Sequence, residues 1–153
     1  MTNFVFQKID ECSDALLLQM EKIENLAQIH PWTSNDLSKC VGSRYYSVGV
    51  FQNETLYGYA IYDYVLDECT LQNICIAPVV QGKKLGSALL KKSLEMITQD
   101  FGIKNVFLEV RVSNIKAINL YVSFGFTEDG YRKGYYTSAT GVCEDALLMS
   151  LHY

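Results

Sequence analysis

The chain has 153 residues, of which 49% are hydrophobic, and carries a formal net charge of −4. This length and apolar content suit a single domain, 1–153, with a core of its own, and the net negative charge disfavours general nucleic-acid binding, which needs a basic face. No run reaches the ~18 apolar residues of a membrane span, and the first residues lack the basic start of a signal peptide, so we expect a cytoplasmic protein without a membrane partner.

The cysteines are five, an odd number, and none is in a C-x-x-C pair. They are Cys12, Cys40, Cys69, Cys75 and Cys143. This pattern favours reduced core thiols over a disulfide framework or a metal site. We therefore expect no metal.

The first third of the chain predicts a short strand at 4–9 and then two helices. Ser13 is suited to cap the first helix, whose apolar stripe is formed by Leu16, Met20, Ile23 and Ala27. A His-Pro-Trp segment ends that helix, and Thr33 or Ser34 can cap a second, shorter one that ends near Val41. The tryptophan suits either a packing role or the border of a ligand groove.

A hairpin comes next, because the β-branched and aromatic segments 44–51 and 55–64 are separated by a short turn at 52–54. Three tyrosines of its second strand suit either a half-exposed face beside a cleft or plain structural packing, namely Tyr57, Tyr59 and Tyr62. A third strand, 71–78, ends at a proline and completes an antiparallel run.

The loop 79–87 places two glycines and two lysines directly before the amphipathic run 88–96. A strand that leads through such a loop into a helix creates an anion site, because the first backbone N–H groups of the helix lack partners and its dipole is positive there. Gly102 is suited to end this helix in the left-handed conformation.

A second strand and helix follow at 105–114 and 115–124, and the strand carries a glutamate, Glu109. The tail predicts a strand at 127–132, a loop that contains two tyrosines, and a last strand at 145–151. Three strands, two strand-helix units and a closing hairpin predict an α/β fold, a mixed sheet with helices on both faces.

Two segments of the chain resemble the GCN5-related N-acetyltransferase (GNAT) family. Gln81-Gly-Lys-Lys-Leu-Gly86 resembles its Q/R-x-x-G-x-G/A pyrophosphate loop, and 108–114 with 117–126 resemble its second half. The sequence departs from the pattern once, since Lys84 stands where the family has its first glycine. The resemblance implies a single-domain, mostly antiparallel sheet and acetyl-CoA as co-substrate.

Further segments resemble the RimI type of this family, the ribosomal-protein alanine N-acetyltransferases. They are His30-Pro-Trp-Thr33, 65–74, Arg132-Lys-Gly-Tyr-Tyr136 and Glu144-Asp-Ala146. This resemblance implies an enzyme that acetylates a protein N-terminus, with a ribosomal small-subunit protein as partner. Two alternatives stay open: an acetyltransferase for a small amine or a lysine side chain, and a non-catalytic acyl-CoA-binding module.

The same resemblance implies a set of cofactor-binding residues. The loop and helix start would hold the pyrophosphate, the preceding strand would pair with the pantetheine arm, and one asparagine would contact the cofactor. These residues are Gly82, Lys83, Lys84, Leu85, Gly86, Ser87, Ile74, Cys75, Ile76 and Asn114. The Lys84 side chain would either obstruct the phosphate or pair with it, and Asn114 is equally suited to cap a helix.

Glu109 and Tyr121 are the candidate general base and general acid for direct attack of an amine on a thioester. Glu109 lies mid-strand among apolar neighbours, although an ion pair with Arg111 would explain it equally well. Tyr121 lies on an apolar helical stripe, which also suits a core aromatic. The spacing of these two residues, and of Glu109 to the following asparagine, matches the pattern of the resembled family.

Overall fold

The computed structural model describes residues 3–138 and 140–153 as one seven-stranded sheet with helices against it. The elements in chain order are β1 (Val5–Lys8), α1 (Asp14–Ala27), α2 (Ser34–Lys39), β2 (Tyr45–Gln52), β3 (Thr55–Val65), β4 (Glu68–Ile76), η1 (Pro78–Val80), α3 (Leu85–Phe101), β5 (Asn105–Arg111), α4 (Ile115–Ser123), β6 (Thr127–Thr137) and β7 (Cys143–His152). The strand order is β1-β2-β3-β4-β5-β7-β6, and β4 with β5 is the parallel pair among otherwise antiparallel neighbours. The predicted mixed, mostly antiparallel sheet is confirmed.

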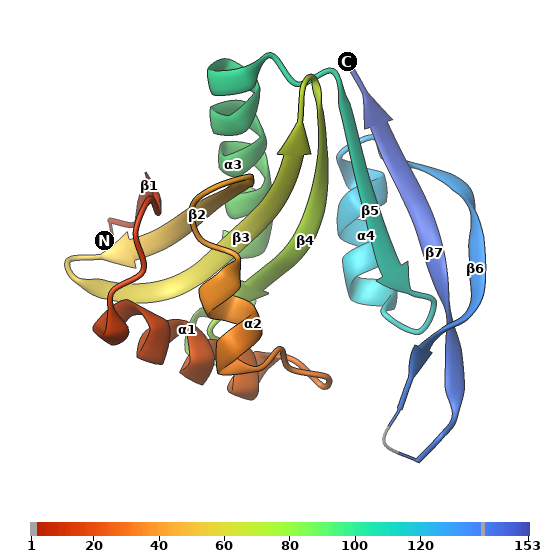
Figure 1. Ribbon diagram of the computed structural model, residues 1–153, viewed down its shortest axis with the longest axis horizontal. Helices are drawn as coiled ribbons and strands as arrows, with labels where there is room; N and C mark the ends of the chain where they lie inside the picture. The colour runs from red at the N-terminus through yellow and green to blue at the C-terminus, as the bar shows by residue number, and fades with distance from the viewer. Residues whose placement is uncertain (1–2, 139) are drawn as a thin grey trace.

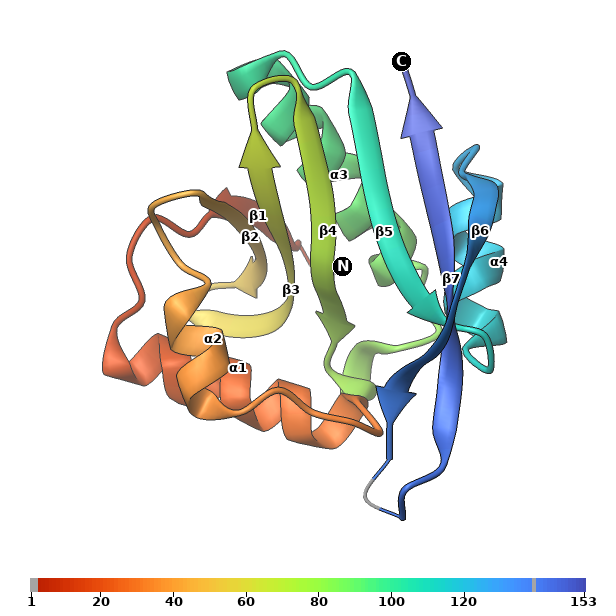
Figure 2. The ribbon, with the colours of Figure 1, turned by 45° about the vertical axis from the view of Figure 1, so that its right-hand side comes forward.

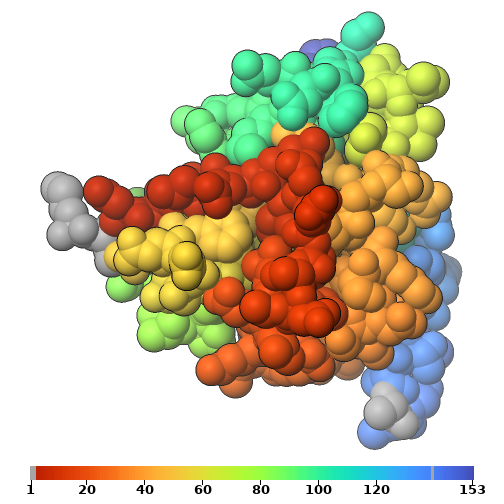
Figure 3. Space-filling view, turned by 60° about the vertical axis from the view of Figure 1, so that its left-hand side comes forward, coloured from red at the N-terminus to blue at the C-terminus, as the bar shows by residue number. Residues whose placement is uncertain are grey.

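Helices cover both faces of the sheet, as predicted. α1 and α2 lie on one face, and α3 and α4 lie on the other (Figures 1 and 2). β1, α1 and α2, coloured red to orange, lie side by side on one surface of the molecule (Figure 3). Four predicted helix ends are confirmed: side chains cap three starts and a left-handed glycine ends α3, at Ser13, Thr33, Asn114 and Gly102. Among the described residues, no helix is both long and apolar enough to cross a membrane.

β4 and β5 separate partway along their length. They pair only where Glu68–Leu71 runs beside Asn105–Leu108, whereas β4 continues to Ile76 against β3 and β5 continues to Arg111 against β7. The sheet therefore opens between the second half of β4 and the end of β5 (Figure 2). This opening places the end of α1, the loop before α3 and the start of α4 around one space.

The structure corrects two expectations about single elements. α3 begins at Leu85 and not at residue 88. β6 extends to Thr137 where a loop with Tyr135 and Tyr136 was expected, and its pairing with β7 is irregular between Arg132 and Tyr136. A left-handed glycine inside that stretch, Gly134 at φ +61°, lets the strand bulge and resume its pairing.

The tyrosines of β3 are mainly core residues. Tyr59 and Tyr62 are both fully buried, because their odd spacing points them to opposite faces of the sheet, toward α1 and toward α3, and both faces are covered. The Tyr59 hydroxyl donates to the Glu24 carboxylate at 3.0 Å, and the Tyr62 hydroxyl lies 2.7 Å from that of Ser93. A cleft-lining role for these two side chains is therefore wrong.

Candidate active site

Two adjoining cavities occupy the opening between β4 and β5. One has a volume of about 400 Å³ and the other about 540 Å³. Six residues line both of them: Ala27, Gln28, Ile74, Asn114, Ala117 and Tyr121. The cavities therefore meet at the end of α1, the middle of β4 and the first turns of α4, and a group passed from one cavity to the other would cross there.

The larger cavity is lined by the predicted cofactor residues. Apart from Lys83, every residue of the predicted set contributes to its wall. The loop before α3 brings Gly82 and Lys84, β4 brings Ile74 to Ile76, and Lys116 of α4 adds a second cation. α3 is a helix of 17 residues, so its first turn offers unpaired backbone N–H groups to an anion. The cavity thus combines backbone donors and ammonium groups suited to phosphates.

Lys84 has a left-handed backbone, with φ +59° and ψ 21°, at the residue that immediately precedes α3. A β-carbon in this conformation costs about 1–2 kcal/mol, which glycine avoids. The family pattern has glycine at this position, so the loop keeps the family's backbone shape even though its residue differs. Lys84 lines the larger cavity at the start of α3.

Cys75 lies in the same wall but is not equipped as a nucleophile. Its side chain is buried between β4 and α1, where its thiol donates to the Ile23 carbonyl at 3.8 Å. Burial raises the pKa of Cys75 to about 12, with the Glu24 carboxyl adding to the effect. A thiol held protonated at neutral pH does not readily accept an acyl group.

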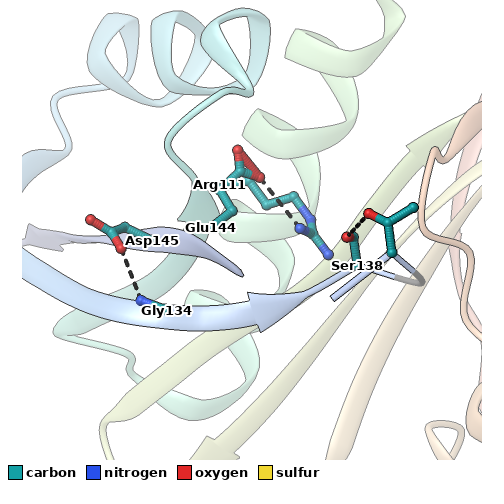
Figure 4. A network of polar contacts seen from close by, with 6 residues as sticks. Arg111, Gly134, Ser138, Glu144 and Asp145 are labelled. Atoms are coloured by element: carbon teal, nitrogen blue, oxygen red, sulfur yellow. Dashed lines mark hydrogen bonds and ion pairs between the residues drawn. The ribbon is translucent and has the colours of Figure 1, made fainter. Parts of the chain in front are cut away.

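Glu109 projects from β5 into the smaller cavity, with its side chain 26% exposed. Its carboxylate pairs with Arg132 of β6 at 3.2 Å. The expected alternative, an ion pair with Arg111, is wrong, because Arg111 instead pairs with Glu144 at 3.3 Å (Figure 4). The carboxylate of Glu109 therefore lies at the cavity wall with a cation from the neighbouring hairpin beside it.

Tyr121 lies where the two cavities meet. Its side chain is only 6% exposed, and its ring packs against Phe126 with 5.8 Å between centroids. Burial raises the pKa of Tyr121, and the neighbouring Tyr136 raises it further. The phenol is consequently protonated at neutral pH, in the wall that the two cavities share. Asn114 caps α4 by accepting from the Ala117 N–H at 3.2 Å.

The C-terminal hairpin contributes a wall that its own acidic residues stabilise. Glu144 binds Arg111, and the guanidinium of Arg111 also lies over the ring of Tyr136, 4.2 Å from its centroid. A hydrogen bond from Ser113, followed by the contact with Arg111, lowers the pKa of Glu144 despite some desolvation. Asp145 accepts from the Gly134 backbone N–H at 2.8 Å, so Asp145 joins the two strands of the hairpin while Glu144 ties the hairpin to β5 (Figure 4).

Sequence reasoning missed Glu24, a buried carboxyl that also lines the smaller cavity. It accepts hydrogen bonds from Tyr59 at 3.0 Å and from the Asn73 side-chain amide at 2.5 Å. Burial raises the pKa of Glu24, although the contacts with Asn73, Tyr59 and the Trp32 backbone N–H oppose this. The available signal was its position four residues after Met20, within the apolar stripe of α1.

Comparison with known proteins agrees with this geometry. The model of the acetyltransferase (GNAT) family matches residues 11–126. The [ribosomal protein bS18]-alanine N-acetyltransferase of Escherichia coli K12 is 40% identical over 129 residues, which cover 84% of this chain and 86% of that protein. The Haemophilus influenzae enzyme of the same name is 36% identical over 148 residues, covering 97% and 98% of the two chains.

Solved structures share the fold. The crystal structure of the Escherichia coli ribosomal-protein-S18-alanine N-acetyltransferase superimposes with a TM-score of 0.87 at 35% identity, over 98% of this chain and 94% of that one. Arabidopsis thaliana NAA60 in complex with acetyl-CoA has a TM-score of 0.85 at 16% identity over 98% of each chain, a likeness of fold alone. On its sequence and its fold, the chain belongs to the GNAT family of acetyltransferases, as an enzyme of the RimI type.

Proposed function

We propose that this enzyme transfers the acetyl group of acetyl-CoA to the N-terminal α-amino group of a protein, the alanine of ribosomal small-subunit protein bS18. The observation that carries the reaction is the junction of the two cavities, where Tyr121 contributes to both walls and Glu109 to the smaller one. The relatives named for bS18 support the choice of acceptor. A ribosomal acceptor places the reaction in the cytoplasm.

In the proposed reaction the larger cavity holds the cofactor and the smaller one holds the peptide start. Glu109 accepts the proton that the α-ammonium must lose, and the neutral nitrogen then attacks the thioester carbonyl carbon. The C–N bond forms as the C–S bond breaks, and Tyr121 donates its hydroxyl proton to the departing thiolate sulfur. The second proton that the nitrogen loses on becoming an amide returns to the Tyr121 phenolate. No acyl-enzyme is required, which agrees with the raised pKa of the Cys75 thiol.

The residues of the larger cavity fit acetyl-CoA by their chemistry. Backbone N–H groups from Leu85 onward and the ammonium groups of Lys84 and Lys116 suit its phosphates. The partly buried side chains of Ile74 and Ile76 suit its apolar stretches. We therefore assign the phosphates to the loop before α3 and the thioester to the junction beside Tyr121.

The test is site mapping by mass spectrometry. The protein is incubated with acetyl-CoA and a synthetic peptide that starts with Ala-Arg and contains one internal lysine. The proposal predicts one added acetyl group on the α-nitrogen. The same peptide with a blocked N-terminus is the control, and acetylation of its lysine at an equal yield would contradict the proposal.

A further inference from the structure

The second half of β4 has an open edge that faces the larger cavity. The Ala77 N–H donates to the Tyr57 carbonyl at 2.8 Å, which marks these residues as a hydrogen-bonded pair. Such pairs alternate along antiparallel strands, so Cys75 also bonds to β3, whereas the backbone groups of Ile74 and Ile76 point away from it. β5 has already diverged at this level, so these groups face the space between the two strands.

Two glutamine side chains bind the carbonyl groups of this edge. The Gln28 amide donates to the Ile74 carbonyl at 3.3 Å, and the Gln81 amide donates to the Ile76 carbonyl at 2.9 Å. The glutamines come from different segments, one from the end of α1 and the other from the loop before α3, and both line the larger cavity. Carbonyls two residues apart lie about 6.7 Å from each other along a strand, so the two glutamine amides bind the strand about 6.7 Å apart.

Gln28 is held in this position by a buried network. Its amide also donates to the Asn73 side-chain oxygen at 3.2 Å, and the Asn73 amide donates in turn to Glu24. Glu24 and Asn73 are both buried. The placement of an amide against the open edge is therefore built into the packing of α1 on β4.

We propose that Gln28 and Gln81 are cofactor-exchange residues, whose amides occupy the open edge of β4 until the amide N–H groups of the pantetheine arm replace them. This inference rests on the proposed function and specifies how the ligand is recognised. The arm carries two secondary amides, the chemistry that the glutamines supply in the free protein. The carbonyls of Ile74 and Ile76 are then hydrogen-bonded both before and after binding.

The proposed exchange predicts that removal of either glutamine side chain strengthens the binding of acetyl-CoA. A hydrogen bond present only in the free protein opposes binding, so its removal tightens the complex. Since a protein hydrogen bond has a net value near 1 kcal/mol, Gln28→Met and Gln81→Met should each lower the Kd of acetyl-CoA roughly two- to tenfold. A side chain that contacted the bound cofactor would show the opposite effect.

Gln19→Met is the matched control. Gln19 lies on the same helix as Gln28 and also donates to a backbone carbonyl, that of Glu54 at 3.4 Å, but it lines neither cavity. This variant should lose stability and keep the wild-type Kd. Adenosine 3′,5′-bisphosphate, which lacks the pantetheine amides, should bind with equal affinity to the wild type and to the Gln28→Met, Gln81→Met and Gln19→Met variants.

Isothermal titration calorimetry of the wild type and the three variants with acetyl-CoA and with the bisphosphate decides the matter. Tighter acetyl-CoA binding by both cavity variants, with no gain for the bisphosphate, supports the exchange. Unchanged or weaker acetyl-CoA binding by these variants overturns the exchange and leaves the proposed function intact. Failure of the wild type to bind millimolar acetyl-CoA would instead overturn the proposed function.

Discussion

Tyr121 illustrates how surroundings assign a role to a residue. Burial raises the pKa of its phenol, so the hydroxyl keeps its proton at neutral pH beside the junction of the cavities. The thiolate that leaves acetyl-CoA is a weaker base in water than a phenolate, by reference pKa values of ~8.5 and ~10. In the proposed reaction, proton transfer therefore depends on the hydroxyl lying directly at the sulfur.

Tyr121→Phe should lower kcat by roughly 10²-fold or more, because general acid catalysis typically contributes ~10² to 10⁴. The ring still packs on Phe126, so the fold and the acetyl-CoA Kd should change little. Steady-state kinetics and calorimetry measure the two quantities. Tyr62→Phe is the control, since it removes a buried hydroxyl bonded to Ser93 outside both cavities. Equal turnover of the wild type and Tyr121→Phe would show that Tyr121 has only a structural role in the core.

Lys84→Gly should stabilise the free protein. Relief of the left-handed backbone is worth about 1–2 kcal/mol, and the greater chain entropy of unfolded glycine offsets about half of it. We expect the free energy of unfolding to rise by about 0.5–1 kcal/mol in urea titrations. Lys84→Ala keeps the β-carbon and should show no such gain. A glycine variant no more stable than the alanine variant would contradict the strain argument.

The positions of single site residues could be predicted only where a motif of the resembled family carried them. Glu109 and Tyr121 were found by their spacing, and the structure brings both to the cavities. The cation beside Glu109 was not predicted, because Arg132 reaches it across the sheet from a strand distant in sequence. Glu24 was overlooked because a glutamate on a helix is normally solvated, and only the packing of α1 on the sheet shows otherwise.

Among the elements, α1 contacts β3 and β4 partly through that buried carboxyl, which bonds to Tyr59 and Asn73. The raised pKa means that the folded protein holds the Glu24 proton more tightly than the unfolded chain does. Its contribution to stability is therefore complete below the ordinary value of 4.5 and declines as pH rises through the raised value. The nearby Cys75 and Tyr59 stay protonated across this range, because burial raises the pKa of both.

Glu24→Gln removes this titration while keeping a carbonyl oxygen for Asn73 and Tyr59. The free energy of unfolding of the variant, minus that of the wild type, should increase as pH rises above about 4.5 and then level off. Urea unfolding at about pH 4.5 and about pH 7.5 measures the difference. A difference independent of pH would show that Glu24 has the same proton affinity in both states.

Elements with local signals were predicted well, and those shaped by distant contacts were not. The capping residues of α1, α2 and α4 reveal helix starts by themselves, because the cap bonds lie within three residues. The extension of β6 through Tyr135 and Tyr136 was missed because it depends on pairing with β7 after a bulge. Asp145, which binds the Gly134 N–H there, lies eleven residues further along the chain.

For the whole molecule, the divergence of β4 and β5 is the central feature. Periodicity predicts strands but gives no sign of where two of them separate, so the opening was not predicted. A ligand in the opening contacts α1, β4, the loop before α3 and α4 together, since all of them line the larger cavity. Its binding should therefore stabilise the fold as one unit.

Acetyl-CoA should raise the free energy of unfolding by RT ln(1 + [L]/Kd), about 2.7 kcal/mol at a hundredfold excess over Kd. Calorimetric scans with and without the cofactor measure the corresponding rise in Tm. Free acetate at the same concentration should have no effect. An unchanged Tm at millimolar acetyl-CoA would mean that the loop 81–87 does not bind its phosphates.

The proposed reaction is acetyl transfer to a protein α-amine with Glu109 as base. An α-amino group has a reference pKa near ~7.7 to 8.0 and a lysine ~10.4, so at pH 7 the neutral fraction of the α-amine is a few hundredfold larger. A single carboxylate base is therefore better suited to deprotonate the α-ammonium group than a lysine ammonium group. Above pH 8 the α-amine is already mostly neutral, so a base should matter most near neutral pH.

The most direct test follows initial rates from about pH 6.5 to 9.5 for the wild type and Glu109→Gln, with an Ala-Arg peptide and its N-blocked, lysine-containing counterpart. We expect the wild type to acetylate the free N-terminus far faster than the lysine. The initial rate of Glu109→Gln, as a fraction of the wild-type rate, should be lowest near neutral pH. Equal rates on the two peptides would contradict the α-amine as acceptor, and a variant that matches the wild type throughout this range would contradict Glu109 as base.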